Sequence, residues 1–295
     1  MKLRAITGVA YFATLVVFYL LKIYVHALCF DALLYAFALI GTFEMTRAFK
    51  DKLTNAEKIV VFTFSALCIP LTSIAQNYGY GVQVSSACFA LFAIATLSLF
   101  VFRYDETSPE NVGITFLSAV YPTALLVILV LVNHIGVTPT MAKYGFNSNL
   151  AILLIFVVSP CADIFAYFFG RFLREKFPKK MAEKISPNKT TIGGIGGFVG
   201  GLVGAVAVYF IYNALCGSFE NMALWLLIYA VTGVISAGAT EFGDLVESSI
   251  KRKVGIKDMG KLLPGHGGVL DRIDGTLFAT VPVYLIFMLV YVLTL

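Results

Sequence analysis

Carboxylates, cations and glycines alternate along residues 241–274, near the end of this 295-residue chain. In the first part of the stretch, Glu241, Asp244, Ser248 and Lys251 recur at intervals of three or four residues. That spacing is typical of one face of an α-helix. A surface lined by acidic, hydroxyl and basic groups would suit a metal ion that is bound together with phosphate groups.

A glycine-containing loop follows this predicted helix. Gly265, Gly267 and Gly268 have no side chains, so their backbone can approach a phosphate closely. Asp271 and Asp274 come directly after the loop and again share one helical face. Solvated loop charges would explain each residue alone. They do not explain a segment in which every few positions supply a carboxylate, a cation or a glycine.

A second polar cluster lies at the end of an apolar run over residues 150–170. Asp163, Tyr167, Gly170 and Arg171 are spaced so that they share one helical face. A charged group in or at the edge of a membrane span is costly, which makes it a functional candidate. The alternative is an Asp–Arg pair that only anchors the helix end.

The third cluster is the short segment 186–191, which is predicted to be a loop. Ser186, Lys189 and Thr190 supply two hydroxyls and one ammonium group, and together with backbone N–H groups these suit a phosphate. The alternative is an ordinary capping turn, in which Thr190 or Thr191 is the N-cap of the next helix.

These clusters must be positioned by elements that cross a membrane. Hydrophobic residues make up 59% of the chain and charged residues only 13%, whereas an average soluble domain is about 25% charged. Apolar runs of about 18 residues or more are typical of transmembrane helices. We therefore predict an all-α, polytopic integral membrane protein with about nine spans, at residues 6–21, 27–43, 59–75, 84–102, 113–133, 150–170, 195–215, 223–240 and 277–295.

The basic residues indicate the orientation of these spans. With nine spans, all but two of the 22 Lys and Arg residues fall on one side of the membrane. Cytoplasmic loops carry an excess of Lys and Arg, so we predict a cytoplasmic N-terminus and an extracytoplasmic C-terminus. The three clusters then face the cytoplasm, and the cell's inner (plasma) membrane is the expected location.

The two halves of the chain differ in polarity, which predicts a difference in role. We treat residues 1–295 as a single membrane domain, because no linker or repeat interrupts it. Residues 1–149 carry little polar chemistry and are expected to form mainly scaffold helices, whereas residues 150–295 are expected to supply the catalytic helices and loops. Glycines four apart within residues 193–204 indicate close packing between helices of this second half.

The last cluster resembles the signature of a known family. The chain reads Ser248-Ser249-Ile250-Lys251-Arg252, then Lys257-Asp258-Met259-Gly260, then Leu263-Pro264-Gly265-His266-Gly267-Gly268-Val269-Leu270-Asp271-Arg272-Ile273-Asp274. This pattern is similar to the full signature of the phosphatidate cytidylyltransferases. Residues 186–190 resemble the Ser-Pro-x-Lys-Thr segment of that family, although Ile192 stands where the family usually has an acidic residue.

The resemblance implies an enzyme, a CTP-dependent nucleotidyltransferase that converts CTP and phosphatidate to CDP-diacylglycerol and pyrophosphate. Two polyanions must meet, so a metal and Lys or Arg side chains must offset their repulsion before an in-line displacement. The lipid phosphate is already an anionic nucleophile, so no covalent enzyme nucleophile is needed. Mg²⁺ is the expected cofactor, and a second cation is left open.

Roles follow for individual residues. We expect Asp244 and Asp271 to hold the metal, with Asp274 as a further ligand or as support for the ligands. Lys251 and Arg252 complete the expected catalytic group. The residues expected to bind substrate are Asp163, Ser186, Lys189, Thr190, Ser248, Lys257, His266, Gly267, Gly268 and Arg272. His266 would serve either as an acid for the leaving group or as a phosphate ligand.

Two other kinds of function share some of these features. One is a related CTP-dependent membrane enzyme, such as a polyprenol kinase or a cytidylyltransferase for isoprenoid ether lipids; the complete signature favours phosphatidate. The other is a transporter, which would place its polar sites near the bilayer midplane of paired repeats. We expect CTP, phosphatidate and membrane lipid as partners and no nucleic acid, while a homodimer is left open.

Overall fold

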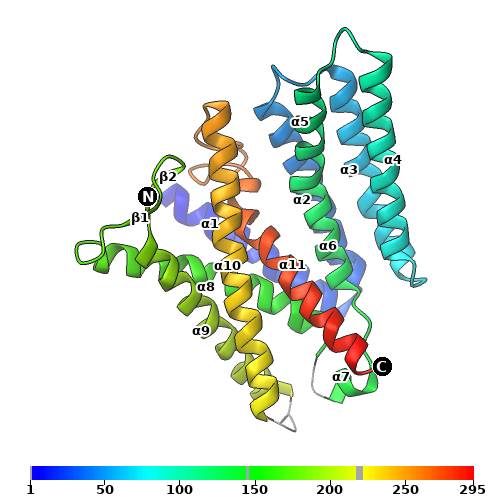
Figure 1. Cartoon of the computed structure of the whole chain (residues 1–295). Coiled ribbons are helices and arrows are strands. Elements are labelled where there is room, and N and C mark those ends of the chain that lie inside the picture. The colour runs from blue at the N-terminus through cyan, green and yellow to red at the C-terminus, as the bar shows by residue number, and fades with distance from the viewer. Residues whose placement is uncertain (1, 144–145, 217–221) are drawn as a thin grey trace. The chain divides into compact units, whose positions relative to one another are not determined.

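The computed structural model describes residues 2–143, 146–216 and 222–295. In chain order (Figure 1) its elements are α1 (Lys2–Tyr24), α2 (Ala27–Ala48), α3 (Asn55–Gln76), α4 (Gly81–Phe102), α5 (Pro109–Ala119), the π-helical turn η1 (Val120–Ala124), α6 (Leu125–Asn133), α7 (Pro139–Lys143), α8 (Ser148–Leu173), β1 (Lys180–Ala182), β2 (Ser186–Thr190), α9 (Thr191–Cys216), α10 (Met222–Val254) and α11 (Leu270–Leu293). Within the described ranges, nine helical stretches are long and apolar enough to cross a membrane, with α5, η1 and α6 counted as one. The predicted all-α, polytopic fold is confirmed.

The chain divides into two compact units, each assembled from segments that are distant in the sequence. Unit 1 comprises Met1–His134 and Lys253–Arg272, and unit 2 comprises Ile135–Arg252 and Ile273–Leu295. The expectation of a single membrane domain over residues 1–295 stays a prediction. The assignment of scaffold and catalytic roles to the two halves of the sequence stays a prediction.

In unit 1, helix α2 packs against α1, α3, α5, η1 and α6. Its inward face is closely packed, with Leu34, Ala38 and Met45 fully buried. A polar contact also joins α2 to α3, since the hydroxyl oxygens of Thr42 and Ser65 lie 2.6 Å apart. A side chain near the end of α2 is therefore carried on a helix that several neighbours hold in place.

In unit 2, glycines let α9 approach its neighbours closely, as the sequence predicts. A Cβ atom at Gly200 would lie 2.4 Å from the carbonyl oxygen of Cys161 on α8, and one at Gly201 would lie 2.4 Å from the Cβ of Ala237 on α10. Both distances are shorter than a real carbon atom tolerates, so only glycine fits at these positions. This packing holds α8, α9 and α10 together.

The structure differs from the sequence prediction at some element ends. Helix α10 continues to Val254, well beyond residue 240, and α11 begins at Leu270 rather than near 277. The predicted spans end where the sequence becomes charged, because they were drawn from runs of apolar residues. The charged residues beyond those ends still keep helical spacing, so the helices extend through them. Residues 180–190 form a short antiparallel hairpin, in which Lys180 pairs with Thr190 and Ala182 with Ser186. Strands this short leave almost no periodic signal.

Candidate active site

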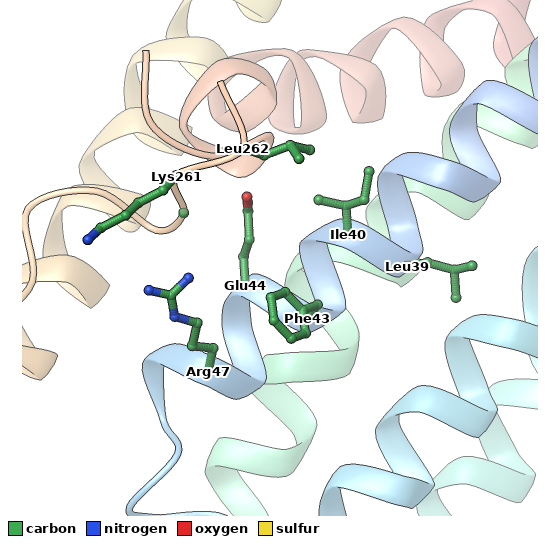
Figure 2. Close-up of a pocket in the computed structure, with 8 residues that line it drawn as sticks. Leu39, Ile40, Phe43, Glu44, Arg47, Lys261 and Leu262 are labelled. Atoms are coloured by element: carbon green, nitrogen blue, oxygen red, sulfur yellow. The ribbon is translucent and has the colours of Figure 1, made fainter. Parts of the chain in front are cut away.

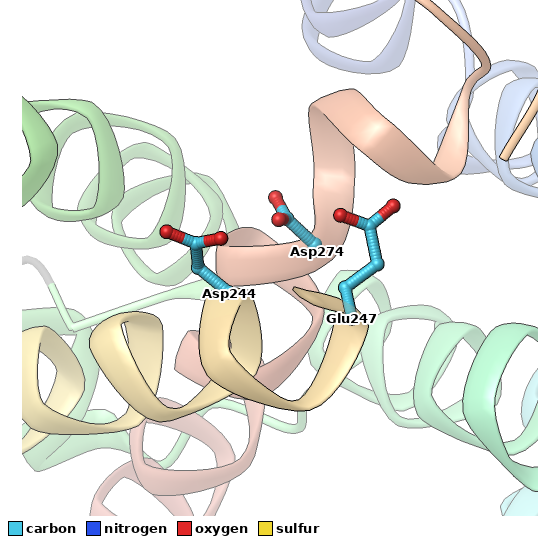
Figure 3. Close-up of side chains that lie close together, drawn as sticks. All are labelled: Asp244, Glu247 and Asp274. Carbon is cyan, nitrogen blue, oxygen red and sulfur yellow. The ribbon is translucent and has the colours of Figure 1, made fainter. Parts of the chain in front are cut away.

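Three carboxylates gather in unit 2. One oxygen from each of Asp244 and Glu247 on α10 and Asp274 on α11 lies within 4.8 Å of the other two, and Figure 3 shows the three side chains projecting from the two helices. Asp244 and Glu247 are three residues apart, which brings them to the same side of α10. We call these three residues the carboxylate cluster.

The cluster has the composition of a metal site. Three carboxylates this close repel one another unless cations lie among them. Carboxylate oxygens are the ligands that hard divalent cations prefer. Asp244, Glu247 and Asp274 could therefore hold a divalent metal. Glu247 belongs to the acidic stretch seen in the sequence, but it was not singled out as a ligand.

Two lysines already pair with the cluster. The Lys189 ammonium group, from β2, lies 2.5 Å from Oδ2 of Asp244, and the Lys251 ammonium group lies 2.5 Å from Oε2 of Glu247. The Ser248 hydroxyl donates a hydrogen bond of 3.3 Å to Oδ1 of Asp244. The structure thus brings Lys189, from the predicted cluster at 186–191, next to Asp244, from the cluster at 241–274. Cations that could bind phosphate lie beside carboxylates that could bind a metal.

The hairpin and α8 contribute the other predicted residues of unit 2. Asp163 on α8 is within electrostatic range of Asp274, Asp244 and Lys189. Arg171 does not pair with Asp163; its guanidinium donates a 2.6 Å hydrogen bond to the Tyr167 hydroxyl.

Two further hydrogen bonds hold the hairpin, one at its last residue and one at its turn. The Thr190 hydroxyl accepts the Gly193 N–H at 3.1 Å, so it caps α9 as the capping alternative proposed. The Arg252 guanidinium lies 3.4 Å from the carbonyl oxygen of Ile185. It thereby ties the end of α10 to the hairpin just before Ser186.

The remaining predicted residues belong to unit 1. They lie on residues 255–269, here called the signature loop, and on the first turn of α11. His266 N–H donates to the Leu263 carbonyl at 2.8 Å, with Pro264 and Gly265 between them and a φ of +78° at Gly265. Pro at the second position and a positive-φ Gly at the third are typical of a type II turn. Lys257 and Arg272 are exposed on either side of this turn.

Asp271 shapes the signature loop. Its Oδ2 accepts two backbone hydrogen bonds of 2.8 Å, from Met259 N–H and from Gly268 N–H. A Cβ atom at Gly267, where φ is +89°, would lie 2.7 Å from the same oxygen. Among the described residues, Asp271 is not a member of the carboxylate cluster, so its expected role as a metal ligand stays a prediction.

Glu44 on α2 is a residue of this site that sequence reasoning missed. Its side chain is only 2% exposed, and its two oxygens accept N–H groups of Val269 and Leu270 at 2.9 Å each. Cβ atoms at Gly260 and Gly268 would lie 2.1 and 2.3 Å from Oε1. An ionisable residue at the edge of a predicted span was the available signal, but nothing in the sequence paired it with the loop.

Thr7 on α1 is a second such residue. Its hydroxyl oxygen lies 2.7 Å from Nδ1 of His266 and 3.1 Å from the carbonyl oxygen of Pro264. A hydroxyl has one proton. When that proton is donated to Pro264, the imidazole donates from Nδ1 to Thr7 and Nε2 carries the lone pair. Thr7 thus orients the ring of His266.

The nine apolar helical stretches of the described residues, an acidic cluster with paired lysines and a glycine-containing loop define a polytopic membrane enzyme that handles phosphate groups. The sequence matches the cytidylyltransferase family over residues 2–291, and the chain belongs to this family. It is 31% identical to the phosphatidate cytidylyltransferase of Helicobacter pylori over 285 residues, which covers 97% of this chain and 91% of that protein. It is also 31% identical to that of Bacillus subtilis over 281 residues, 94% of each chain.

A shorter stretch is more similar still. Over 142 residues the chain is 42% identical to the phosphatidate cytidylyltransferase of Brucella abortus, which covers 48% of this chain and 47% of that protein. The expected recognition of this family from the signature is confirmed.

Proposed function

We propose that this protein transfers the cytidylyl group of CTP to phosphatidate, which gives CDP-diacylglycerol and pyrophosphate. A phosphate oxygen of phosphatidate attacks the α-phosphorus of CTP, and the bond from that phosphorus to the oxygen bridging to the β-phosphorus breaks. Pyrophosphate leaves with this oxygen, so the reaction needs no other co-reactant. The single observation that carries the proposal is the carboxylate cluster with its two paired lysines, in a chain of the cytidylyltransferase family.

The chain's own residues have distinct roles in this proposal. Asp244, Glu247 and Asp274 would hold Mg²⁺, and a metal there would supply charge neutralisation for the phosphates. Lys189 and Lys251 would exchange their carboxylate partners for phosphate oxygens of CTP. Ser248 keeps Asp244 oriented, and Asp163 lies within electrostatic range of Asp244 and Asp274. A second cation, and Asp271 as a metal ligand, belong to the same proposal.

Other residues would bind substrate without metal contact. The side chains of Lys257, His266 and Arg272 are proposed to bind phosphate groups. The backbone N–H groups of His266 and Gly268, which were expected to join them, already donate to the Leu263 carbonyl and to Asp271. Arg252 anchors the hairpin and adds positive charge. We further propose that these residues face the cytoplasm from the inner membrane, that no nucleic acid takes part, and that the protein works as a homodimer or a monomer.

Pyrophosphate release from CTP by the purified protein tests the proposal. Release that requires both phosphatidate and Mg²⁺ is expected, with little release when ATP replaces CTP. Turnover of a polyprenol with CTP in place of phosphatidate would move the assignment to a kinase. A protein without release under any of these conditions would not be a nucleotidyltransferase.

A further inference from the structure

A groove of about 390 Å³ opens on unit 1, between the last turns of α2 and the signature loop. Its walls include Leu39, Ile40, Phe43 and Arg47 from α2, and Lys261 and Leu262 from the loop, as Figure 2 shows. None of the residues that line the groove belongs to the carboxylate cluster. Its shape and lining suggest a ligand with two chemically different ends.

One end of the groove is cationic. Arg47 and Lys261 lie at this end in Figure 2, and both are exposed. Among the described residues neither makes an ion pair, so both charges are available to an anion. Glu44 also borders the groove, but its two oxygens already accept backbone N–H groups at 2.9 Å. Arg47 is within electrostatic range of this carboxylate, so this end of the groove holds two cations and one carboxylate and keeps a net positive charge.

The other end of the groove is apolar and belongs to a span. Leu39 lies eight residues before Arg47 on α2, which is about 12 Å along a helix axis. Phe43 on α2 is 55% exposed, and exposed apolar side chains on a membrane-spanning helix face lipid chains. Cations at the helix end with apolar residues deeper in the membrane match a phospholipid, whose phosphate lies at the interface and whose chains point inward.

We propose that this groove binds the lipid substrate, with the phosphate of phosphatidate between Arg47 and Lys261 and an acyl chain along Phe43, Ile40 and Leu39. The inference rests on the proposed function for the identity of the lipid. Lys261 and Leu262 belong to the signature loop, so the bound headgroup contacts that loop directly. A nonspecific attraction between cations and an anionic bilayer is the competing explanation.

Two substitutions and one matched control separate these explanations. Arg47→Gln and Lys261→Gln each remove one groove cation. Lys50→Gln removes one exposed cation from the loop after α2, outside the groove. All three change the bulk charge equally, and none removes a buried group. Thermal unfolding of each variant verifies that it is folded.

Kinetics in neutral mixed micelles and direct binding of radiolabelled phosphatidate without CTP are then measured for each variant. Each groove variant should raise the phosphatidate KM and weaken binding about tenfold, the scale of one lost hydrogen bond to a charged group. The CTP KM should stay within about twofold, and Lys50→Gln should match wild type. A rise in the CTP KM alone, or equal effects of all three variants, would overturn the proposal.

A steric variant tests the apolar end of the groove. Ile40→Trp would fill the space assigned to the acyl chain, whereas Leu67→Trp adds the same bulk at a position that is 53% exposed on α3. Only Ile40→Trp should weaken binding of long-chain phosphatidate; binding unchanged by it would count against the groove. If wild type shows no turnover, the proposed function fails while the binding measurements still decide whether the groove takes this lipid.

Discussion

The side chain of Glu44 and the backbone of Val269 are 225 positions apart in the sequence, yet they are joined by a 2.9 Å hydrogen bond. The second oxygen of Glu44 accepts Leu270 N–H at 2.9 Å. The first N–H groups of a helix have no partner within the helix, so Glu44 satisfies donors at the start of α11. It thereby fastens the signature loop to α2.

Glu44→Gln should lower kcat by more than the accompanying loss of folded protein explains. The amide keeps the size of the side chain but turns an NH₂ group toward a backbone N–H, which leaves a buried donor unsatisfied. We expect about 1–3 kcal/mol lower free energy of unfolding and a fall in kcat larger than the loss of folded protein explains. Glu110→Gln, which removes only an exposed ion pair with Lys52, is the control. Equal kcat values for both variants would show that Glu44 does not position the loop.

Gly267→Ala should lower activity strongly, and Gly255→Ala should not. Both glycines have positive φ, +89° and +72°, so alanine brings a similar backbone strain of about 1–2 kcal/mol. At Gly267 the new methyl group would also lie 2.7 Å from Oδ2 of Asp271, whereas nothing lies within 4 Å at Gly255. The measurement is turnover at matched folded fractions. Similar losses in both variants would mean that strain alone matters.

Asp244→Asn and Asp274→Asn should leave expression and thermal stability near wild type and reduce turnover at least about a hundredfold, the scale of a lost metal-site group. Asn keeps the size of Asp and removes its charge. A purely structural ion pair would instead lose activity in step with the folded fraction. Activity measured against Mg²⁺ concentration should show partial recovery at high Mg²⁺. Near-normal activity at limiting Mg²⁺ would contradict a metal site here.

The same titration separates two roles for Asp271. We expect Asp271→Asn to lose at least about a hundredfold in turnover with near-normal stability, because one amide oxygen can still accept the Met259 and Gly268 N–H groups. Recovery at high Mg²⁺ would support the predicted metal ligand. A loss that Mg²⁺ does not change would assign Asp271 to shaping the loop.

Hydropathy and spacing predicted the parts of this fold that depend on local sequence. In the part of the chain that the structure describes, each of the nine apolar runs lies in a helical stretch, and Asp244 and Ser248 share a face of α10 as their spacing predicted. Tertiary contacts were beyond such reasoning, because nothing in the sequence around Glu44 points to Val269. Asp271 and Asp274 are one helical turn apart, and the sequence favoured Asp271 as the metal ligand. In the structure, backbone N–H groups engage Asp271, and Asp274 joins the carboxylate cluster.

The orientation of the chain can be tested without any assay of activity. All but two of the 22 Lys and Arg residues lie on one side of nine spans, and such loops are cytoplasmic. A reporter fused after Leu295 should therefore behave as extracytoplasmic, and one inserted in the exposed stretch 183–184 as cytoplasmic. A cytoplasmic signal at the C-terminus would mean that one of the nine helices does not cross the membrane.

Transfer of label from CTP to lipid tests the central claim most directly. Purified protein is incubated with phosphatidate, Mg²⁺ and CTP that is labelled either at the α-phosphate or at the γ-phosphate. In-line cytidylyl transfer moves the α-label into the organic phase as CDP-diacylglycerol and leaves the γ-label in water as pyrophosphate. We expect this result, with the transfer abolished when phosphatidate is omitted. Appearance of the γ-label in the lipid, or absence of either label from it, would contradict the proposed function.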